Sequence, residues 1–149
     1  MSFKEKVYSA FLDSITRQVT DYQKNLDDLA ESAANETKST AGDKHETALA
    51  MLQIEQRNIK GRLAEAQEKK KLLEKISPVV SSLVVVKGSL VQTNLGYFYL
   101  SVALGKIEVE RTSIMAISPV SPLGSKLLGL KMGDKVDLNA NAYFIQSIE

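Results

Sequence analysis

The chain contains no cysteine and no tryptophan, and it has a single histidine among its 149 residues. The absence of cysteine excludes disulfides, thiolate catalysis and cysteine–zinc sites. With His45 as the only histidine, we expect neither a classical zinc site nor a Ser-His-Asp triad elsewhere in the chain. The formal net charge is +1, so no overall field would recruit DNA or an acidic membrane.

Long apolar runs are also missing. The first six residues, Met-Ser-Phe-Lys-Glu-Lys, lack the apolar core of a signal peptide. Apolar stretches such as 79–80 and 83–86 are far too short to span a bilayer. We therefore expect a cytoplasmic protein with no membrane partner, and the length fits one domain or two small ones.

The first half of the chain is typical of long helices. Residues 3–76 contain no proline, and glycine occurs there only at Gly42 and Gly61. Apolar residues recur with alternating spacings of four and three, which is the a/d seam of a coiled coil. The first seam consists of Tyr8, Leu12, Ile15, Val19, Tyr22, Leu26 and Leu29. The second has Leu52, Ile59, Ala66 and Leu73 in one heptad position, and Leu49 and Leu63 in the other. Helices over about 3–33 and 43–76 would fold as an antiparallel hairpin.

An acidic cluster lies near the turn between these helices, at about residues 35–47. Asp43 and Glu46 have the i, i+3 spacing of a helix cap and its capping-box partner, and acids are favoured at a helix start. Because a long hairpin would place its turn tens of Å from the rest of the protein, the same acids also suit delivery into a partner's active site. Both interpretations stay open.

The second half changes to β character after Ser77-Pro78, because proline ends the preceding helix. Expected β segments are 79–86, 90–93, 97–101, 113–117, 135–138 and 143–148. A short helix is expected between Pro122 and Gly129. The sequence thus predicts an α+β protein: a coiled-coil hairpin over 1–77, then a small antiparallel β domain with one short helix over 78–149.

Two segments resemble the Gre family of bacterial transcript-cleavage factors. Residues 42–48, Gly-Asp-Lys-His-Glu-Thr-Ala, are similar to the family's tip motif, Gly-Asp-Leu-x-Glu-Asn-Ala-Glu-Tyr. Residues 117–136 resemble its C-terminal signature, in which Ser-Pro opens a short helix ending Leu-Leu-Gly, followed by Gly-Asp and a closing strand. The second match is the more specific. Domain order and length also fit the family, so the resemblance spans nearly the whole chain.

The resemblance implies a function and a partner. It implies an FKBP-like C-terminal domain that docks, through the segment containing Ser121 and Pro122, on the rim of RNA polymerase's secondary channel. The coiled coil would enter that channel and bring Asp43 and Glu46 to the polymerase active site. There they would share a weakly held Mg²⁺ and stimulate cleavage of the backtracked RNA 3′ end. On this interpretation the chain is a monomer and not an enzyme by itself, since the polymerase supplies the catalytic activity.

Three departures from the family's pattern bear on this interpretation. Leu49 stands where the family has a third tip acid, and Val120 stands where an acid precedes Ser-Pro. The usual Arg-Pro element of the first helix is absent. A channel regulator that does not stimulate cleavage is therefore the main alternative. Glu36 is a candidate third acid without a motif match, and His45 is more simply a solvated residue than a proton shuttle.

Other functional classes are less well supported. Lys69-Lys70-Lys71 is more simply a solvated helix face than an RNA contact, and Tyr97-Phe98-Tyr99 more simply feeds a core. Prolyl isomerisation would rest on fold analogy alone. A plain interaction module would be favoured by an exposed apolar stripe that includes Phe3, Phe11 and Met51.

Overall fold

The computed structural model describes the backbone of residues 1–37 and 43–149 and the side chains of residues 1–36 and 46–149. Two long helices are followed by a six-stranded sheet and one short helix, which confirms the predicted α+β class. The elements are α1 (Phe3–Thr37), α2 (Asp43–Glu74), β1 (Leu90–Thr93), β2 (Gly96–Leu100), β3 (Gly105–Val109), β4 (Thr112–Ile117), α3 (Pro122–Leu127), β5 (Lys135–Leu138) and β6 (Asn141–Ile148). No helix among the described residues has the length and apolar composition needed to cross a membrane.

Contacts divide the chain into two compact units. One unit contains Met1–Ser14 and Lys69–Glu149, and the other contains Ile15–Glu68. The first turns of α1 and the last turns of α2 therefore belong with the sheet, which we call the sheet unit. The remaining helical residues form the hairpin unit. The division predicted from the sequence, 1–77 and 78–149, falls where helical character changes to β character, so it differs from the division by contacts.

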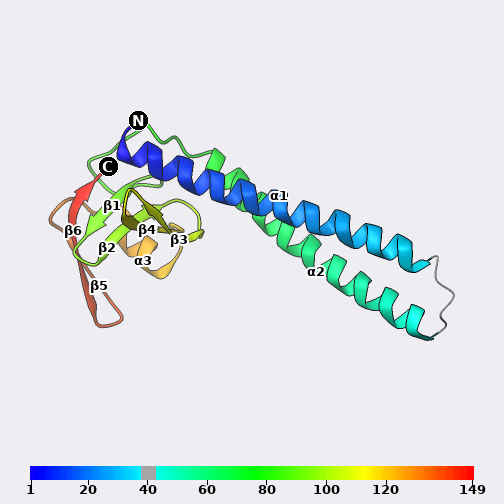
Figure 1. Ribbon diagram of the computed structural model, residues 1–149. Helices are drawn as coiled ribbons and strands as arrows, with labels where there is room; N and C mark the ends of the chain where they lie inside the picture. The colour runs from blue at the N-terminus through cyan, green and yellow to red at the C-terminus, as the bar shows by residue number, and fades with distance from the viewer. Residues whose placement is uncertain (38–42) are drawn as a thin grey trace. The chain divides into compact units, whose positions relative to one another are not determined.

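The hairpin unit is built on the predicted apolar seams. In Figure 1, α1 and α2 run antiparallel and side by side. Ile15, Val19 and Ala66 are buried, and the seam residues farther toward the turn are half-buried, whereas most residues between them are exposed. The half-buried seam residues are Tyr22, Leu26, Leu29, Leu49, Leu52, Ile59 and Leu63. This burial is what an a/d seam of alternating spacing requires.

The sheet is mixed: the predicted antiparallel pairing holds for four of its five neighbouring strand pairs, and one pair is parallel. Its strand order is β3-β4-β2-β1-β6-β5, and β2 and β4 pair in parallel while the other neighbours are antiparallel. The reason is β3, which the sequence prediction missed: the chain leaves β2, forms this edge strand and turns back through Glu110 and Arg111 into β4. Both turn residues have positive φ, of 50° and 65°, as the tight turn of a hairpin requires.

Residues 79–86, all of which the structure describes, form no strand, although their composition predicted β structure. Only Val84 makes an isolated bridge, to Lys131. Serine hydroxyls satisfy amides that a strand would pair with another strand: Val84 N–H donates to Ser82 Oγ and Val86 N–H donates to Ser89 Oγ. Such local bonds compete with a β ladder, and the segment exposes Val79, Val80 and Leu83.

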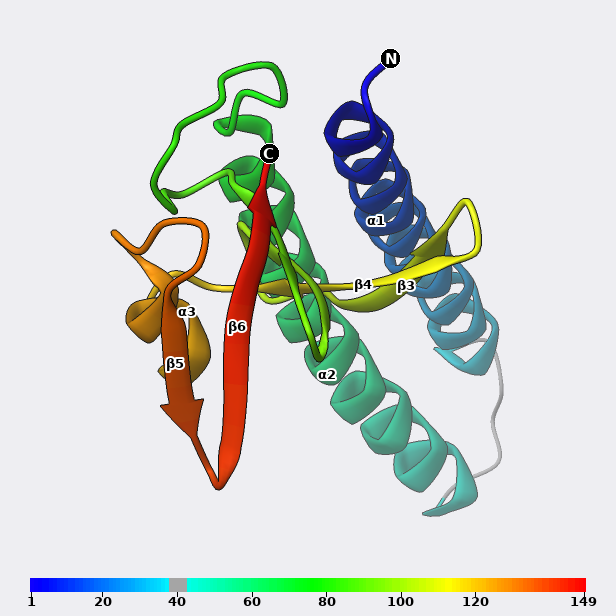
Figure 2. The same ribbon diagram turned by 90° about the vertical axis from the view of Figure 1, so that its left-hand side faces the viewer.

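The two faces of the sheet are covered differently. Figure 2 shows α3 on one side of the sheet, near β5. On this side a buried cluster consists of Val85, Val91, Leu100, Leu127, Val136 and Ile145. On the other face, Tyr97 contacts Phe3 edge-on, and Tyr99 stacks on Phe11 with ring centroids 6.0 Å apart. The aromatic run of β2 therefore serves the core, as the sequence indicates.

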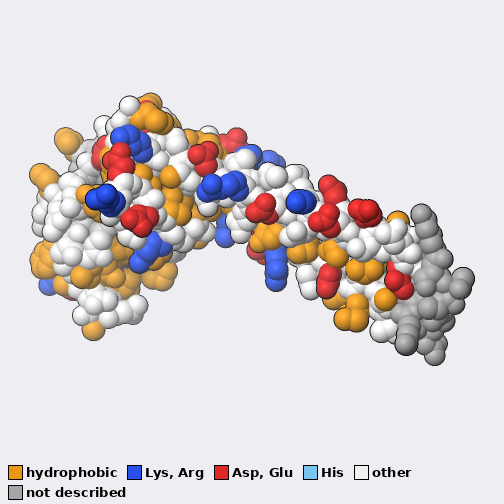
Figure 3. All heavy atoms as spheres, in the orientation of Figure 1, with side chains coloured by type: hydrophobic (Ala, Val, Ile, Leu, Met, Phe, Trp, Pro, Cys, Tyr) orange, Lys and Arg blue, Asp and Glu red, His pale blue; other side chains and the backbone are white. Residues whose placement is uncertain are grey.

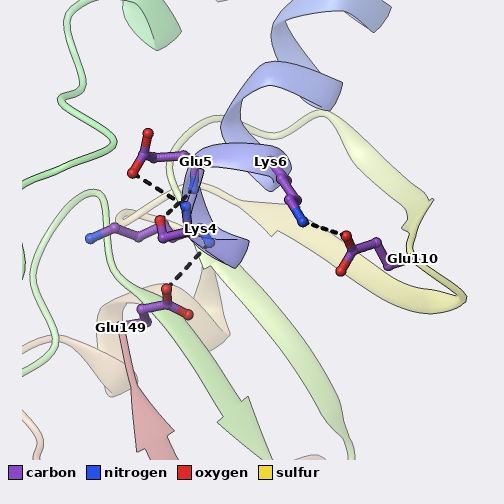
Figure 4. Close-up of polar contacts among 6 residues, drawn as sticks. Lys4, Glu5, Lys6, Glu110 and Glu149 are labelled. Atoms are coloured by element: carbon purple, nitrogen blue, oxygen red, sulfur yellow. Dashed lines mark hydrogen bonds and ion pairs between the residues drawn. The ribbon is translucent and has the colours of Figure 1, made fainter.

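Polar contacts also attach the first turn of α1 to the sheet (Figure 4). Lys4 N–H donates to Glu149 Oε1 at 3.4 Å, and Lys6 Nζ lies 2.6 Å from Glu110 Oε1. Lys4 is buried, and its Nζ donates to the Val80 carbonyl at 2.6 Å. Burial lowers the pKa of the Lys4 ammonium, and the nearby Glu149 carboxylate partly opposes this shift.

Tyr99 is the largest completely buried side chain of this face, with 0% exposure. Its hydroxyl finds no hydrogen-bond partner among the described residues. Burial raises the pKa of the Tyr99 hydroxyl, and the neighbouring Tyr8 raises it further. A buried hydroxyl without a partner costs stability, which makes Tyr99 a weak point of this core.

Candidate functional site

The acidic motif of the hairpin falls at the start of α2. The helix begins at Asp43, and Glu46 lies in its first turn with an exposed side chain. Backbone N–H groups in this turn have no partner within the helix, and the helix dipole favours negative charge there. The side chains of Asp43 and His45 lie outside the described residues, so the predicted capping pair and metal pair remain predictions.

The other two candidate tip positions face the seam. Glu36 and Leu49 are both half-buried, at positions that continue the alternating spacing of the two seams. Leu49 thus has a packing role that a carboxylate would not fill. No group of three or more His, Asp or Glu side chains that could hold a metal occurs within the described part of the chain.

Charge on the hairpin unit is predominantly acidic. Residues 15–68 contain ten Asp and Glu against seven Lys and Arg. Figure 3 shows carboxylates recurring along the visible face of its helices. This unit would therefore be attracted to basic surroundings rather than to nucleic acid directly.

The apolar stripe that would favour a plain interaction module does not form. Phe11 is buried and Phe3 is half-buried, and both contact aromatic side chains of β2. Met51 and Ile54 are exposed, at 61% and 52%, and lie in the hairpin unit. The three predicted members of the stripe therefore do not share one solvated surface.

The Ser-Pro signature folds as a capped helix start. Ser121 is the N-cap of α3, and its Oγ accepts from the Gly124 N–H at 3.1 Å while donating to the Ser118 carbonyl at 2.6 Å. Pro122 occupies the first turn, where no N–H is needed. Because the Ser121 hydroxyl is used inside the loop, its role in this structure is to fix the conformation of the segment.

Gly124 shows why this part of the signature requires a small residue. A Cβ at Gly124 would lie 2.0 Å from the Ser118 carbonyl oxygen. The close approach holds the 118–121 loop against α3, and Leu127 anchors the other end of the helix in the core. In this loop Val120 is exposed, at 88%, and Pro122 at the start of α3 is exposed as well.

A cleft of about 430 Å³ lies next to this loop. Its walls come from Lys69 and Leu72 of α2, from Lys87, and from residues 101–103 and 118–120. Sequence reasoning did not find this cleft, because its walls come from four separate segments. The only signals in the sequence were the lysine run 69–71 and the departure at Val120.

Comparison with known proteins adds little to these observations. No family model and no curated protein matches the chain. Among solved structures, one described as the structure of the transcription factor Gfh1 aligns over 92% of each chain, with 18% sequence identity and a TM-score of 0.37. A likeness at this level carries no argument about activity, so a functional assignment depends on the residues themselves.

Proposed function

We propose that this protein is a Gre-like transcription elongation factor that enters the secondary channel of RNA polymerase and stimulates cleavage of backtracked RNA. The observation that supports it is the placement of two sequence motifs. The tip motif coincides with the start of α2 in a helical hairpin, and Glu46 is exposed there. The Ser-Pro signature coincides with the capped start of α3.

The tip residues suit the chemistry that this function needs. Mg²⁺ prefers carboxylate oxygens and retains several waters, so it is commonly held jointly by protein and substrate groups. An exposed Glu46, with Asp43 three residues earlier, could complete a site whose remaining ligands belong to the polymerase. When bound, this Mg²⁺ would stabilise charge on the scissile phosphate. The chain would then contribute positioning and two oxygen ligands, and the polymerase would remain the enzyme.

A second candidate function is occupation of the channel without cleavage. Leu49 favours it, because this residue replaces the family's third acid and is half-buried on the hairpin seam. The matched motif then supplies at most two carboxylates to the tip. In this case the factor would inhibit or modulate the polymerase by occupying its channel.

One experiment distinguishes the two functions. The cognate polymerase is stalled in a backtracked complex with end-labelled RNA, and short 3′ fragments are followed after addition of the protein and Mg²⁺. Cleavage by the wild type that is lost in Asp43→Ala and Glu46→Ala supports the first function. Glu65→Ala, an exposed acid farther along α2, is the matched control and should cleave normally. Binding without fragments supports the regulator, and absence of binding contradicts both.

A further inference from the structure

The cleft beside the Ser-Pro loop is lined by apolar residues and by two lysines. Leu72, Val102 and Ala103 contribute apolar surface, and Lys69 and Lys87 contribute the only charged side chains among its lining residues. A volume of about 430 Å³ lies in the lower range of pockets that hold a ligand or an anchoring side chain. The cleft therefore offers apolar surface together with two cationic side chains.

The charges of both lysines remain available to a partner. The side-chain ammonium groups of Lys69 and Lys87 make no hydrogen bond or ion pair with any residue in the part of the chain that the structure describes. The whole sheet unit is also basic, with twelve Lys and Arg against eight Asp and Glu. A surface of one sign steers and selects partners of the opposite sign.

We propose that this cleft binds an acidic segment of RNA polymerase that inserts an apolar side chain between Lys69 and Lys87. The inference rests on the proposed function for the identity of the partner. It goes beyond that function because Val120 replaces the acid of the family's signature, at the edge of the same cleft. Val120 removes that negative charge, so on this proposal the two lysines, and not an acid, supply the docking charge.

The first test measures affinity for immobilised cognate core polymerase by biolayer interferometry at several salt concentrations. An exposed ion pair contributes up to roughly a 5-fold change in affinity. Lys69→Glu and Lys87→Glu should each weaken binding by at least that factor, because reversal adds repulsion, and both should flatten the salt dependence. Lys106→Glu, an exposed lysine of β3 that does not line the cleft, should stay within about 2-fold of wild type.

A second variant tests the docking charge directly. Val120→Asp restores the acid of the family's pattern at an exposed position, so folding should be unaffected. The proposal expects weaker binding to the cognate polymerase, by roughly 5-fold. Tighter binding of this variant would overturn the proposal and return the docking charge to the family's pattern.

Crosslinking identifies the occupant. The chain has no cysteine, so Ala103→Cys gives a single attachment point for a photocrosslinker on an exposed residue of the cleft. Mass spectrometry should locate the crosslink in a polymerase segment that carries several Asp or Glu around an aliphatic or aromatic residue. A crosslink to a basic segment, or equal effects of the Lys87 and Lys106 reversals, overturns the proposal while leaving polymerase binding intact. Absence of wild-type binding overturns the proposed function as well.

Discussion

Replacing Tyr99 by phenylalanine should stabilise the sheet unit. The Tyr99 side chain is completely buried, and its hydroxyl has no partner among the described residues. A buried hydroxyl left without a hydrogen bond costs about 1–3 kcal/mol. Removal of one oxygen forfeits a few van der Waals contacts, each worth about 0.1–0.2 kcal/mol. The stacking of the ring on Phe11 is retained, so we expect a net gain of about 0.5–2 kcal/mol.

Calorimetry can measure this gain. For a chain of this length, 1 kcal/mol shifts Tm by about 2–4 °C, so Tyr99→Phe should melt about 1–8 °C higher than the wild type. Tyr97→Phe is the matched control, because Tyr97 lies on the same strand and its half-buried side chain is not among the unsatisfied groups. Its Tm should change by less than 2 °C. A lower Tm for Tyr99→Phe would refute the reasoning, because it would show that the hydroxyl is hydrogen-bonded in solution.

The same variant has a distinct pH dependence. The pKa of Tyr99 is raised in the folded state, so the unfolded chain releases this proton first, near the ordinary value of 10.0. Above that pH the unfolded state binds fewer protons, and the wild type loses stability as pH rises. Tyr99→Phe should lack this part of the loss, which urea unfolding between pH 9 and about 11 would detect. Equal slopes for both proteins would contradict the raised pKa.

Three further predictions follow from other positions. Gly124→Ala should destabilise the protein by about 2–4 kcal/mol, measured by urea unfolding, because its Cβ would meet the Ser118 carbonyl oxygen; the exposed Ser125→Ala should change stability by less than about 0.5 kcal/mol. Leu49→Glu should lower the free energy of unfolding by roughly 1–2 kcal/mol, because it places a charge on the seam, and circular dichroism should record a lower melting temperature of the helices. The same variant should raise RNA cleavage if a third acid is what the tip lacks. Lys4→Met should remove a rise in stability with pH. The pKa of Lys4 in the folded state is lowered from 10.5, so below that pH the unfolded state holds more protons and the stability of the wild type rises with pH. If urea unfolding from pH 8 to 10.5 gave the same slope of stability against pH for Lys4→Met and the wild type, the prediction would be contradicted.

The helical part of the fold could be predicted from the sequence because its signals are local. The alternating spacing from Ile15 to Leu29 identifies the residues that the structure buries or half-buries in the hairpin unit. The start of α2 at Asp43 also agrees with the prediction, since Gly42 and the polar residues before it interrupt the helical pattern. The short helix α3 was predictable for the same reason, because proline at its start and glycine after its end are position-specific signals.

The sheet was less predictable because strand pairing depends on distant residues. The 79–86 segment has the composition of a strand, yet serine hydroxyls satisfy amides that would otherwise pair. The edge strand β3, with one buried residue at Val109, carries a weak signal, and without it the parallel pairing of β2 and β4 could not be inferred.

The sequence by itself determined the two helical seams, the position of Glu46 in the first turn of a helix, and the capped start of α3. These features follow from backbone preferences and periodicity within a few residues of each site. Only the tertiary structure decided that the Ser121 hydroxyl is used internally and that Val120 borders a cleft with Lys69 and Lys87. That cleft gathers residues separated by up to 51 positions along the chain, and no local rule of sequence brings them together.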